Sequence, residues 1–185
     1  MKLLIALYFY ILATIQLGLL LGIYHYYRSQ STVRPSSYWM GSLVVSILAL
    51  TTFGTGIVAI EDVSKPEFNF TIANSLFYIA AVLQFLFCRS LNKPISRRLK
   101  YAFLLSVLIF IPSFEWMRLH GTFESRTAII CVITGFFFIL QIFQLRTKRK
   151  TTPSQQLIYL QYATTAELFF AIGRLSVVIA SGFTI

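Results

Sequence analysis

Six long stretches of apolar residues constrain this chain more than any other feature of its sequence. A helix needs about 20 mostly apolar residues to cross the hydrocarbon core of a bilayer, which is about 30 Å thick. The stretches that approach or exceed this length are Leu3–Tyr26, Tyr38–Ile60, Thr71–Leu91, Tyr101–Trp116, Thr127–Leu145 and Leu157–Phe183. Their apolar residues run continuously, whereas the strands of a membrane β-barrel alternate apolar and polar residues. The sequence therefore predicts an all-α, polytopic membrane helical bundle that forms a single domain over residues 1–185.

The composition supports the same class of protein. Hydrophobic residues make up 57% of the chain and charged residues 12%, whereas soluble domains contain about 45–50% and about 25%. This composition excludes a soluble enzyme, a disordered chain and a disulfide scaffold. The first apolar stretch exceeds the roughly 7–15 residues of a signal peptide, and no small-x-small cleavage site follows it, so we expect it to be retained. The fourth stretch is the shortest and contains Pro112 near its end.

The net charge of the chain is +10, and the distribution of its Lys and Arg residues among the loops predicts the orientation of the helices in the membrane. Eleven of the sixteen Lys and Arg residues lie in or beside the first, third and fifth loops: Arg28, Arg34, Arg89, Lys93, Arg97, Arg98, Lys100, Arg146, Lys148, Arg149 and Lys150. The second and fourth loops combine three cations with four acidic residues: Lys65, Arg118, Arg126, Glu61, Asp62, Glu67 and Glu124. The positive-inside rule therefore places loops one, three and five in the cytoplasm and the amino terminus outside.

With this orientation, the sixth helix ends on the outer face of the membrane. A seventh helix would return the chain to the cytoplasm. We therefore expect the chain to be the front part of a seven-helix protein, although a six-helix protein is the alternative.

Five polar residues in or beside the predicted helices are candidates for a ligand site: Asn74, Glu115, Arg126, Glu167 and Arg174. Ionisable groups inside a membrane are costly and are therefore functional candidates. Glu167 and Arg174 are seven residues apart, so they share nearly the same face of one helix. We expect the five residues to converge on an outward-facing cavity, where two guanidinium groups would favour an anionic or carbonyl-bearing ligand. An internal Glu–Arg network that fixes helix packing explains these residues equally well.

Other side chains are predicted to have structural roles. Four glutamines are expected to form hydrogen bonds between helices: Gln16, Gln84, Gln141 and Gln161. Cys88 and Cys131 are expected to be buried thiols, and the sequence has no pattern of a catalytic, cofactor or metal site. Gly18 and Gly22 form a G-x-x-x-G pair, which predicts close helix packing within the bundle rather than dimerisation.

Several short motifs resemble the multi-span amino-terminal sensor regions of bacterial membrane-bound diguanylate cyclases and histidine kinases. They cover most of the chain from Tyr38 onward: Tyr38-Trp39-Met40-Gly41, a loop with Pro66, Thr71-Ile-Ala-Asn74, the stretch from Phe85 to Arg89, Arg126 and Gly173-Arg174. The resemblance implies a bacterial cytoplasmic membrane, a seventh helix that leads into a cytoplasmic output domain, and roles for Asn74, Arg126 and Arg174. The sequence departs from this pattern in having six spans, and it contains no catalytic residues of a kinase or cyclase.

Three functions remain open at this point. The first is a sensory domain whose partners are the lipid bilayer, a small ligand from the outer side, a cytoplasmic output domain and a second copy of the chain. The second is a small transporter or channel-like protein, for which Glu167 would be the ionisable group near the midplane. The third is an accessory subunit of a membrane complex, marked by helix faces rich in small residues (Gly18, Gly22, Gly54 and Gly56). Neither enzymatic activity nor nucleic-acid binding is expected, because His25 and His120 lie at opposite faces and the cations follow the topology.

Overall fold

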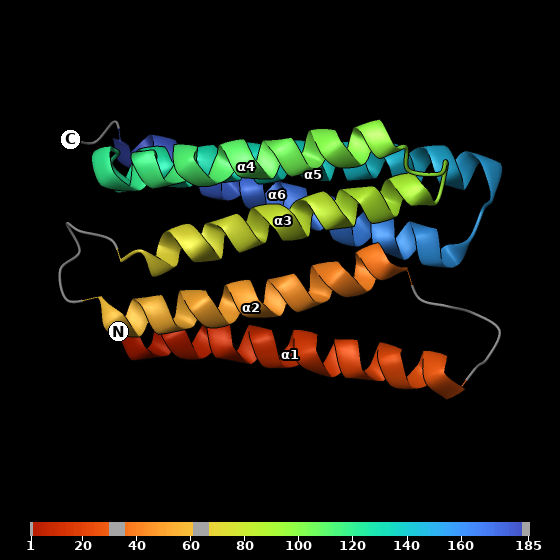
Figure 1. The fold of residues 1–185 in the computed structure, drawn as a ribbon, viewed down its shortest axis with the longest axis horizontal. Coiled ribbons are helices and arrows are strands. Elements are labelled where there is room, and N and C mark those ends of the chain that lie inside the picture. The colour runs from red at the N-terminus through yellow and green to blue at the C-terminus, as the bar shows by residue number, and fades with distance from the viewer. Residues whose placement is uncertain (1, 30–35, 61–66, 183–185) are drawn as a thin grey trace. The chain divides into compact units, whose positions relative to one another are not determined.

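The computed structural model describes residues 2–29, 36–60 and 67–182, and its architecture is all-helical over these residues (Figure 1). The six helices are α1 (Lys2–Ser29), α2 (Ser37–Ala59), α3 (Asn69–Ser90), α4 (Arg97–His120), α5 (Phe123–Thr151) and α6 (Gln155–Gly182). All six are long and apolar enough to cross a membrane, which confirms the predicted class of multi-pass helical protein. Some predicted loop residues lie outside the described residues: Arg34, Glu61, Asp62, Lys65 and Pro66.

The fourth and fifth helices are longer than their apolar stretches predict. Ser96 caps α4, because its hydroxyl accepts a hydrogen bond from the Leu99 N–H at 3.3 Å, and the helix continues through Pro112 to His120. Thr122 caps α5 in the same way, accepting from the Ser125 N–H at 3.2 Å. Capping satisfies the free backbone N–H groups of a first turn and allows polar residues to begin the helix. A count of apolar residues misses these polar turns.

The chain divides into two compact units, and the division passes through α3 and α4. The first unit comprises residues 1–83 and 107–115, and the second comprises residues 84–106 and 116–185.

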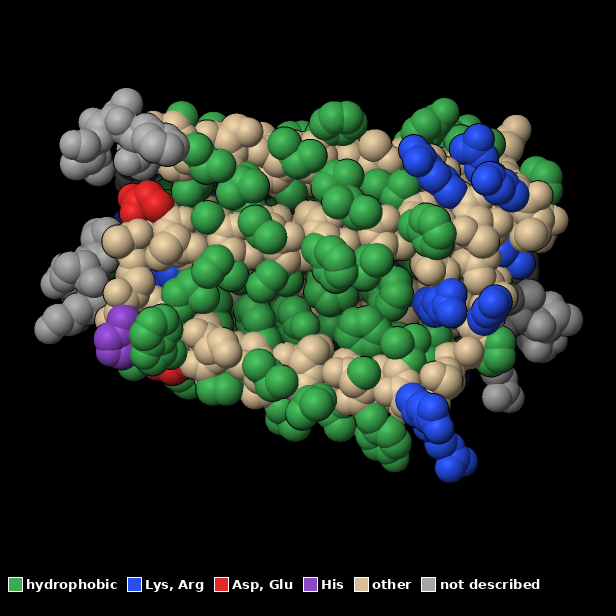
Figure 2. Space-filling model, turned by 90° about the horizontal axis from the view of Figure 1, so that it is seen from above, with side chains coloured by type: hydrophobic (Ala, Val, Ile, Leu, Met, Phe, Trp, Pro, Cys, Tyr) green, Lys and Arg blue, Asp and Glu red, His purple; other side chains and the backbone are tan. Residues whose placement is uncertain are grey.

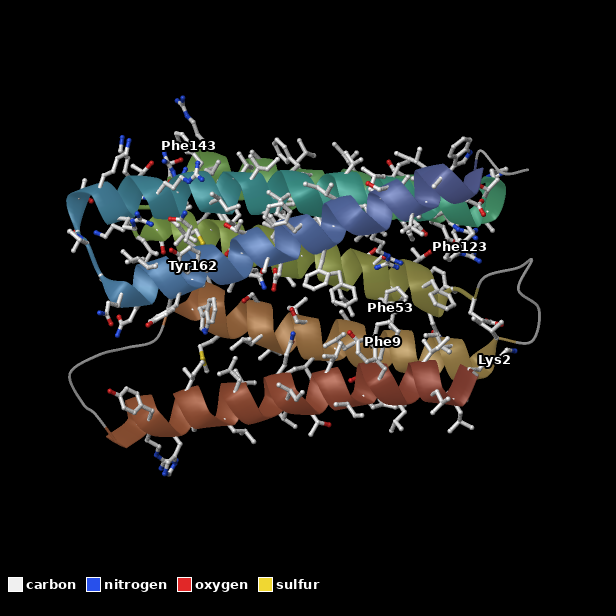
Figure 3. The ribbon with its side chains drawn as sticks, turned by 180° about the vertical axis from the view of Figure 1, so that it is seen from behind. Lys2, Phe9, Phe53, Phe123, Phe143 and Tyr162 are labelled. Carbon is white, nitrogen blue, oxygen red and sulfur yellow. The ribbon has the colours of Figure 1, made fainter. Side chains whose placement is uncertain are left out.

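In the first unit, α1 packs along α2, and α2 packs against α3. Phe9 of α1 stacks on Phe53 of α2 with ring centroids 5.2 Å apart, and these two rings point toward one another in Figure 3. Phe53 also meets the edge of Phe70 of α3 at 5.3 Å. Gly54 and Gly56 allow these approaches, because a Cβ on Gly54 would lie 3.0 Å from the Tyr10 ring and one on Gly56 would lie 3.2 Å from the Asn69 Cβ.

The structure contradicts the prediction that Gly18 and Gly22 mediate packing within the bundle. A Cβ added to either glycine would meet no atom within 4 Å in the described part of the chain. Gly54 and Gly56 are the α2 glycines that bring helices together in the first unit, although they do not form a G-x-x-x-G pair. The difference is one of position: both buried glycines face an aromatic side chain of the neighbouring helix, whereas α1 presents Gly18 and Gly22 away from α2.

In the second unit, α5 packs along α6, and three phenylalanines join the other helices to α5. Phe85 of α3 lies 5.4 Å from Phe103 of α4 and 6.4 Å from Phe137 of α5, measured between ring centroids. Cys88 and Cys131 are free, buried thiols, as predicted. Large apolar side chains are exposed in both units, including Leu3 of α1 at 78% and Phe170 of α6 at 79%. Figure 2 shows hydrophobic side chains over much of the visible face. Because water would not tolerate so many exposed apolar side chains, this surface fits a lipid bilayer.

Candidate polar site in the spanning helices

The five predicted site residues belong to different units. Asn74 and Glu115 lie in the first unit, whereas Arg126, Glu167 and Arg174 lie in the second. Convergence of all five residues on one cavity therefore stays a prediction.

In the first unit, Glu115 of α4 contacts α3 through a side-chain hydrogen bond. The Thr71 hydroxyl donates to Glu115 Oε2 at 2.5 Å, Thr71 is 2% exposed and Glu115 is half-buried. A hydrogen bond within a protein contributes about 0.5–1.5 kcal/mol, and more when one of the groups is ionised. This contact joins two membrane-spanning helices through a carboxylate.

Three polar residues on one face of α3 extend this site. Thr71, Asn74 and Ser75 follow a spacing of three and four residues, which places them side by side on a helix. All three are buried; the Asn74 amide donates to the Phe70 carbonyl oxygen at 2.7 Å, and the Ser75 hydroxyl has no partner among the described residues. We call Thr71, Asn74, Ser75 and Glu115 the α3–α4 polar cluster. Thr71 and Ser75 were not predicted as site residues, although their spacing around Asn74 was the available signal.

Aromatic stacking fixes the register of α3 on α4 beside this cluster. Tyr78 of α3 stacks on Phe110 of α4 with centroids 4.3 Å apart and planes 5° from parallel. Thr71 and Tyr78 are seven residues apart, so both contacts with α4 lie along one stripe of α3. The rigid apolar pair therefore positions the carboxylate opposite the hydroxyl.

In the second unit, Arg126 lies near the start of α5 and contacts the end of α4 across the turn between these helices. Its guanidinium group donates from Nη1 to the Arg118 carbonyl oxygen at 3.0 Å, in the last turn of α4. The turn itself requires Gly121, because a Cβ there would lie 2.7 Å from the Met117 carbonyl oxygen and 2.9 Å from Ser125 Oγ. Since carbonyl groups at the end of a helix lack helical partners, Arg126 has at least this structural role.

Glu167 and Arg174 lie on α6, and both are exposed. In the part of the chain that the structure describes, neither side chain forms a hydrogen bond or a salt bridge. Their predicted sharing of one helix face follows from the helix itself, since both lie within α6 and are two turns apart. Within this unit the predicted internal Glu–Arg network is therefore absent for the described residues.

The amide side chains have mixed outcomes. Gln161 of α6 accepts a hydrogen bond from Arg149 of α5 at 3.3 Å, as the predicted role between helices requires. Gln16 Oε1 and Gln141 Nε2 are buried without a partner among the described residues, so the prediction is wrong for these atoms. Gln144 was not predicted to connect helices, but its side chain is 8% exposed and accepts hydrogen bonds from Arg89 at 3.4 Å and from Asn92 at 3.1 Å.

Within the described ranges, no group of three or more His, Cys, Asp or Glu residues is arranged to hold a metal ion. No family model, curated protein or solved structure matches this chain. The resemblance to bacterial sensor regions therefore stays a prediction, and the geometry of the polar residues carries the functional argument.

Proposed function

We propose that this chain is a membrane-embedded signal-input domain whose helix packing responds to a small anionic or carbonyl-bearing ligand. The contact between Thr71 and Glu115 is the observation that carries this proposal. A carboxylate in a spanning helix is costly to retain, and this one joins α3 to α4 at Thr71. One helical turn after Thr71, the buried Ser75 hydroxyl has no partner among the described residues. A ligand that competes for these groups would change how the two helices pack, which is what a two-state receptor requires.

The proposal includes an orientation. Loops one, three and five would face the cytoplasm of a bacterial cell, because eleven of the sixteen Lys and Arg residues lie in or beside them. The α3–α4 polar cluster would then lie near the outer side of the membrane, where a ligand can reach it without crossing the bilayer. The output would be a cytoplasmic domain.

Complementation in cells tests the signalling proposal. Deletion of the natural gene should change the transcript profile, and wild-type protein should restore it. Glu115→Gln should fail to restore it while the protein remains at the wild-type level in the membrane. Arg28→Gln serves as the control, because Arg28 is an exposed cation in the last turn of α1, outside the polar cluster. Restoration by Glu115→Gln, Arg126→Gln and Arg174→Gln alike would contradict the proposal.

A direct binding experiment complements the cellular one. Purified protein in nanodiscs is heated with acetate, succinate or citrate as carboxylate probes. A probe at 100 times its dissociation constant should stabilise the protein by about 2.7 kcal/mol, and Glu115→Gln should change that response. If every probe stabilises wild type and variant equally, the probes do not bind at the α3–α4 polar cluster, which would contradict the proposal.

A transporter is the second candidate, and Glu167 is the observation that favours it. This carboxylate lies in the middle of α6 and forms no hydrogen bond or salt bridge among the described residues, as expected of an ion-coupling group between cycles. Uptake of a carboxylate probe into proteoliposomes, abolished by Glu167→Gln and retained by Glu115→Gln, would favour transport over sensing.

A further inference from the structure

The second unit carries a strongly basic end that the proposed function does not use. Residues 84–106 and 139–162 contain nine of the sixteen Lys and Arg residues: Arg89, Lys93, Arg97, Arg98, Lys100, Arg146, Lys148, Arg149 and Lys150. No Asp or Glu lies in residues 84–106 or 125–166. We call the nine Lys and Arg residues the basic end. The charge of these segments is therefore not balanced by carboxylates within them.

Side-chain contacts hold parts of the basic end together. Asn92, just after α3, donates to the Gln144 carbonyl oxygen of α5 at 2.8 Å, and Arg89 donates to the Gln144 side chain. Arg149 of α5 donates to Gln161 of α6. These contacts bring the end of α3, the end of α5 and the start of α6 together, and Figure 2 shows lysine and arginine side chains gathered at one end of the visible face.

The partners of these two arginines are neutral amides. Gln144 and Gln161 orient the guanidinium groups of Arg89 and Arg149 but do not neutralise them. The first turn of α4 adds Arg97, Arg98 and Lys100 and contains no acidic residue. Cations at the amino terminus of a helix repel its partial positive charge, so the protein retains an arrangement that an external anion would stabilise.

Exposed tyrosines show at which level in a membrane this end lies. Tyr101 of α4 is 68% exposed, and Tyr159 and Tyr162 of α6 are 67% and 63% exposed (Tyr162 in Figure 3). Exposed tyrosine rings are typical of the headgroup level, where an apolar ring and a polar hydroxyl are both accommodated. The anions available at that level are the phosphate groups of lipids, which favours them over a soluble anion.

We propose that the basic end binds the headgroup phosphates of anionic phospholipids, with Arg89 and Arg149 pre-positioned by Gln144 and Gln161. If cations were attracted to the membrane only by its general negative charge, every Lys and Arg would contribute equally to lipid binding. The proposal instead assigns lipid selectivity to the basic end of the second unit, and lipid bound there would connect the ends of α3, α4 and α5.

Native mass spectrometry of the full chain in detergent, titrated with phosphatidylglycerol or phosphatidylcholine, tests this proposal. Wild type should bind phosphatidylglycerol more tightly. Each cation near an anionic surface strengthens binding roughly fivefold. Lys93→Gln/Arg97→Gln/Arg98→Gln, which changes three exposed residues, should therefore weaken binding of phosphatidylglycerol on the order of 100-fold. Arg97→Lys/Arg98→Lys should retain the affinity, because it keeps the charges.

Further arms keep the proposal falsifiable. If the triple variant does not insert, Arg146→Gln/Lys150→Gln changes two other exposed cations and should weaken binding on the order of 30-fold. Arg28→Gln, in the first unit, should leave the affinity unchanged. Equal affinity for both lipids, an unchanged affinity of the charge-removing variants, or full competition by millimolar inorganic phosphate would each overturn the proposal.

Discussion

Glu115 and Glu167 are both carboxylates of membrane-spanning helices, but the structure treats them differently. Glu115 accepts a hydrogen bond from buried Thr71, beside stacked Tyr78 and Phe110. Glu167 is exposed on α6 without a hydrogen bond or salt bridge in the described part of the chain. An ionisable residue in a spanning helix can therefore connect two helices through a hydrogen bond, as Glu115 does, or lie on the helix surface without such a contact, as Glu167 does. Only the first kind should contribute strongly to the stability of the protein.

Removal of the carboxylate should produce the largest difference between the two sites. Glu115→Ala leaves the buried Thr71 hydroxyl without its acceptor, so we expect a loss of about 1–3 kcal/mol in unfolding free energy. Glu167→Ala should cause no such loss, because Glu167 forms no hydrogen bond or salt bridge among the described residues. Chemical unfolding in detergent micelles measures both values. Equal losses of unfolding free energy for the two variants would contradict the conclusion that only Glu115 contributes strongly to stability.

The Gln144 side chain of the second unit tests whether a neutral amide also contributes to stability by connecting segments of the chain. Gln144→Leu removes an acceptor from both Arg89 and Asn92 while keeping a similar volume. We expect a loss of about 1–2 kcal/mol, since donors in partly buried sites lose their partner. Gln141→Leu is the matched control three residues earlier, because Gln141 Nε2 is buried without a partner in the described part of the chain. Its substitution should be neutral or stabilising, and a larger loss for Gln141→Leu would contradict this assignment.

Thr71→Val tests the hydrogen bond to Glu115 by removing its donor. Valine keeps the shape of threonine but removes the hydroxyl, so the expected loss is about 1 kcal/mol. A double-mutant cycle with Glu115→Gln should give a coupling of at least about 0.5 kcal/mol, because the two groups are in contact. Purely additive effects would show that the hydrogen bond contributes little in the membrane-like environment.

The smallest predicted effect concerns the glycines. Gly18→Ala on α1 should leave stability within about 0.5 kcal/mol of wild type, because an added Cβ meets no atom within 4 Å. Gly54→Ala would place a Cβ 3.0 Å from the Tyr10 ring and should be the more destabilising of the two. Thermal unfolding of both variants in one detergent makes this comparison. A larger loss for Gly18→Ala would indicate that α1 packs against another chain.

The candidate site was only partly predictable from the sequence. Asn74 and Glu115 were singled out because polar groups are rare in apolar spans, and both belong to the α3–α4 polar cluster. Thr71 and Ser75 were missed, because hydroxyl residues are common in spanning helices and their importance depends on the helix opposite. Gln144 was missed for a similar reason: its neighbours Arg89, at the end of α3, and Asn92, just after α3, lie more than fifty residues earlier in the chain.

The sequence by itself determined the six membrane-spanning helices, because the length of an apolar stretch and the thickness of the bilayer are enough to define them. It also determined at which ends of the apolar stretches the cations gather, because Lys and Arg are largely excluded from the apolar stretches themselves. Only the tertiary structure decided which residues meet across helices. Thr71 with Glu115, Arg89 with Gln144 and Tyr10 with Gly54 are long-range pairs. Such pairs depend on the register and rotation of packed helices, which apolar patterns leave undetermined when nearly every face is apolar.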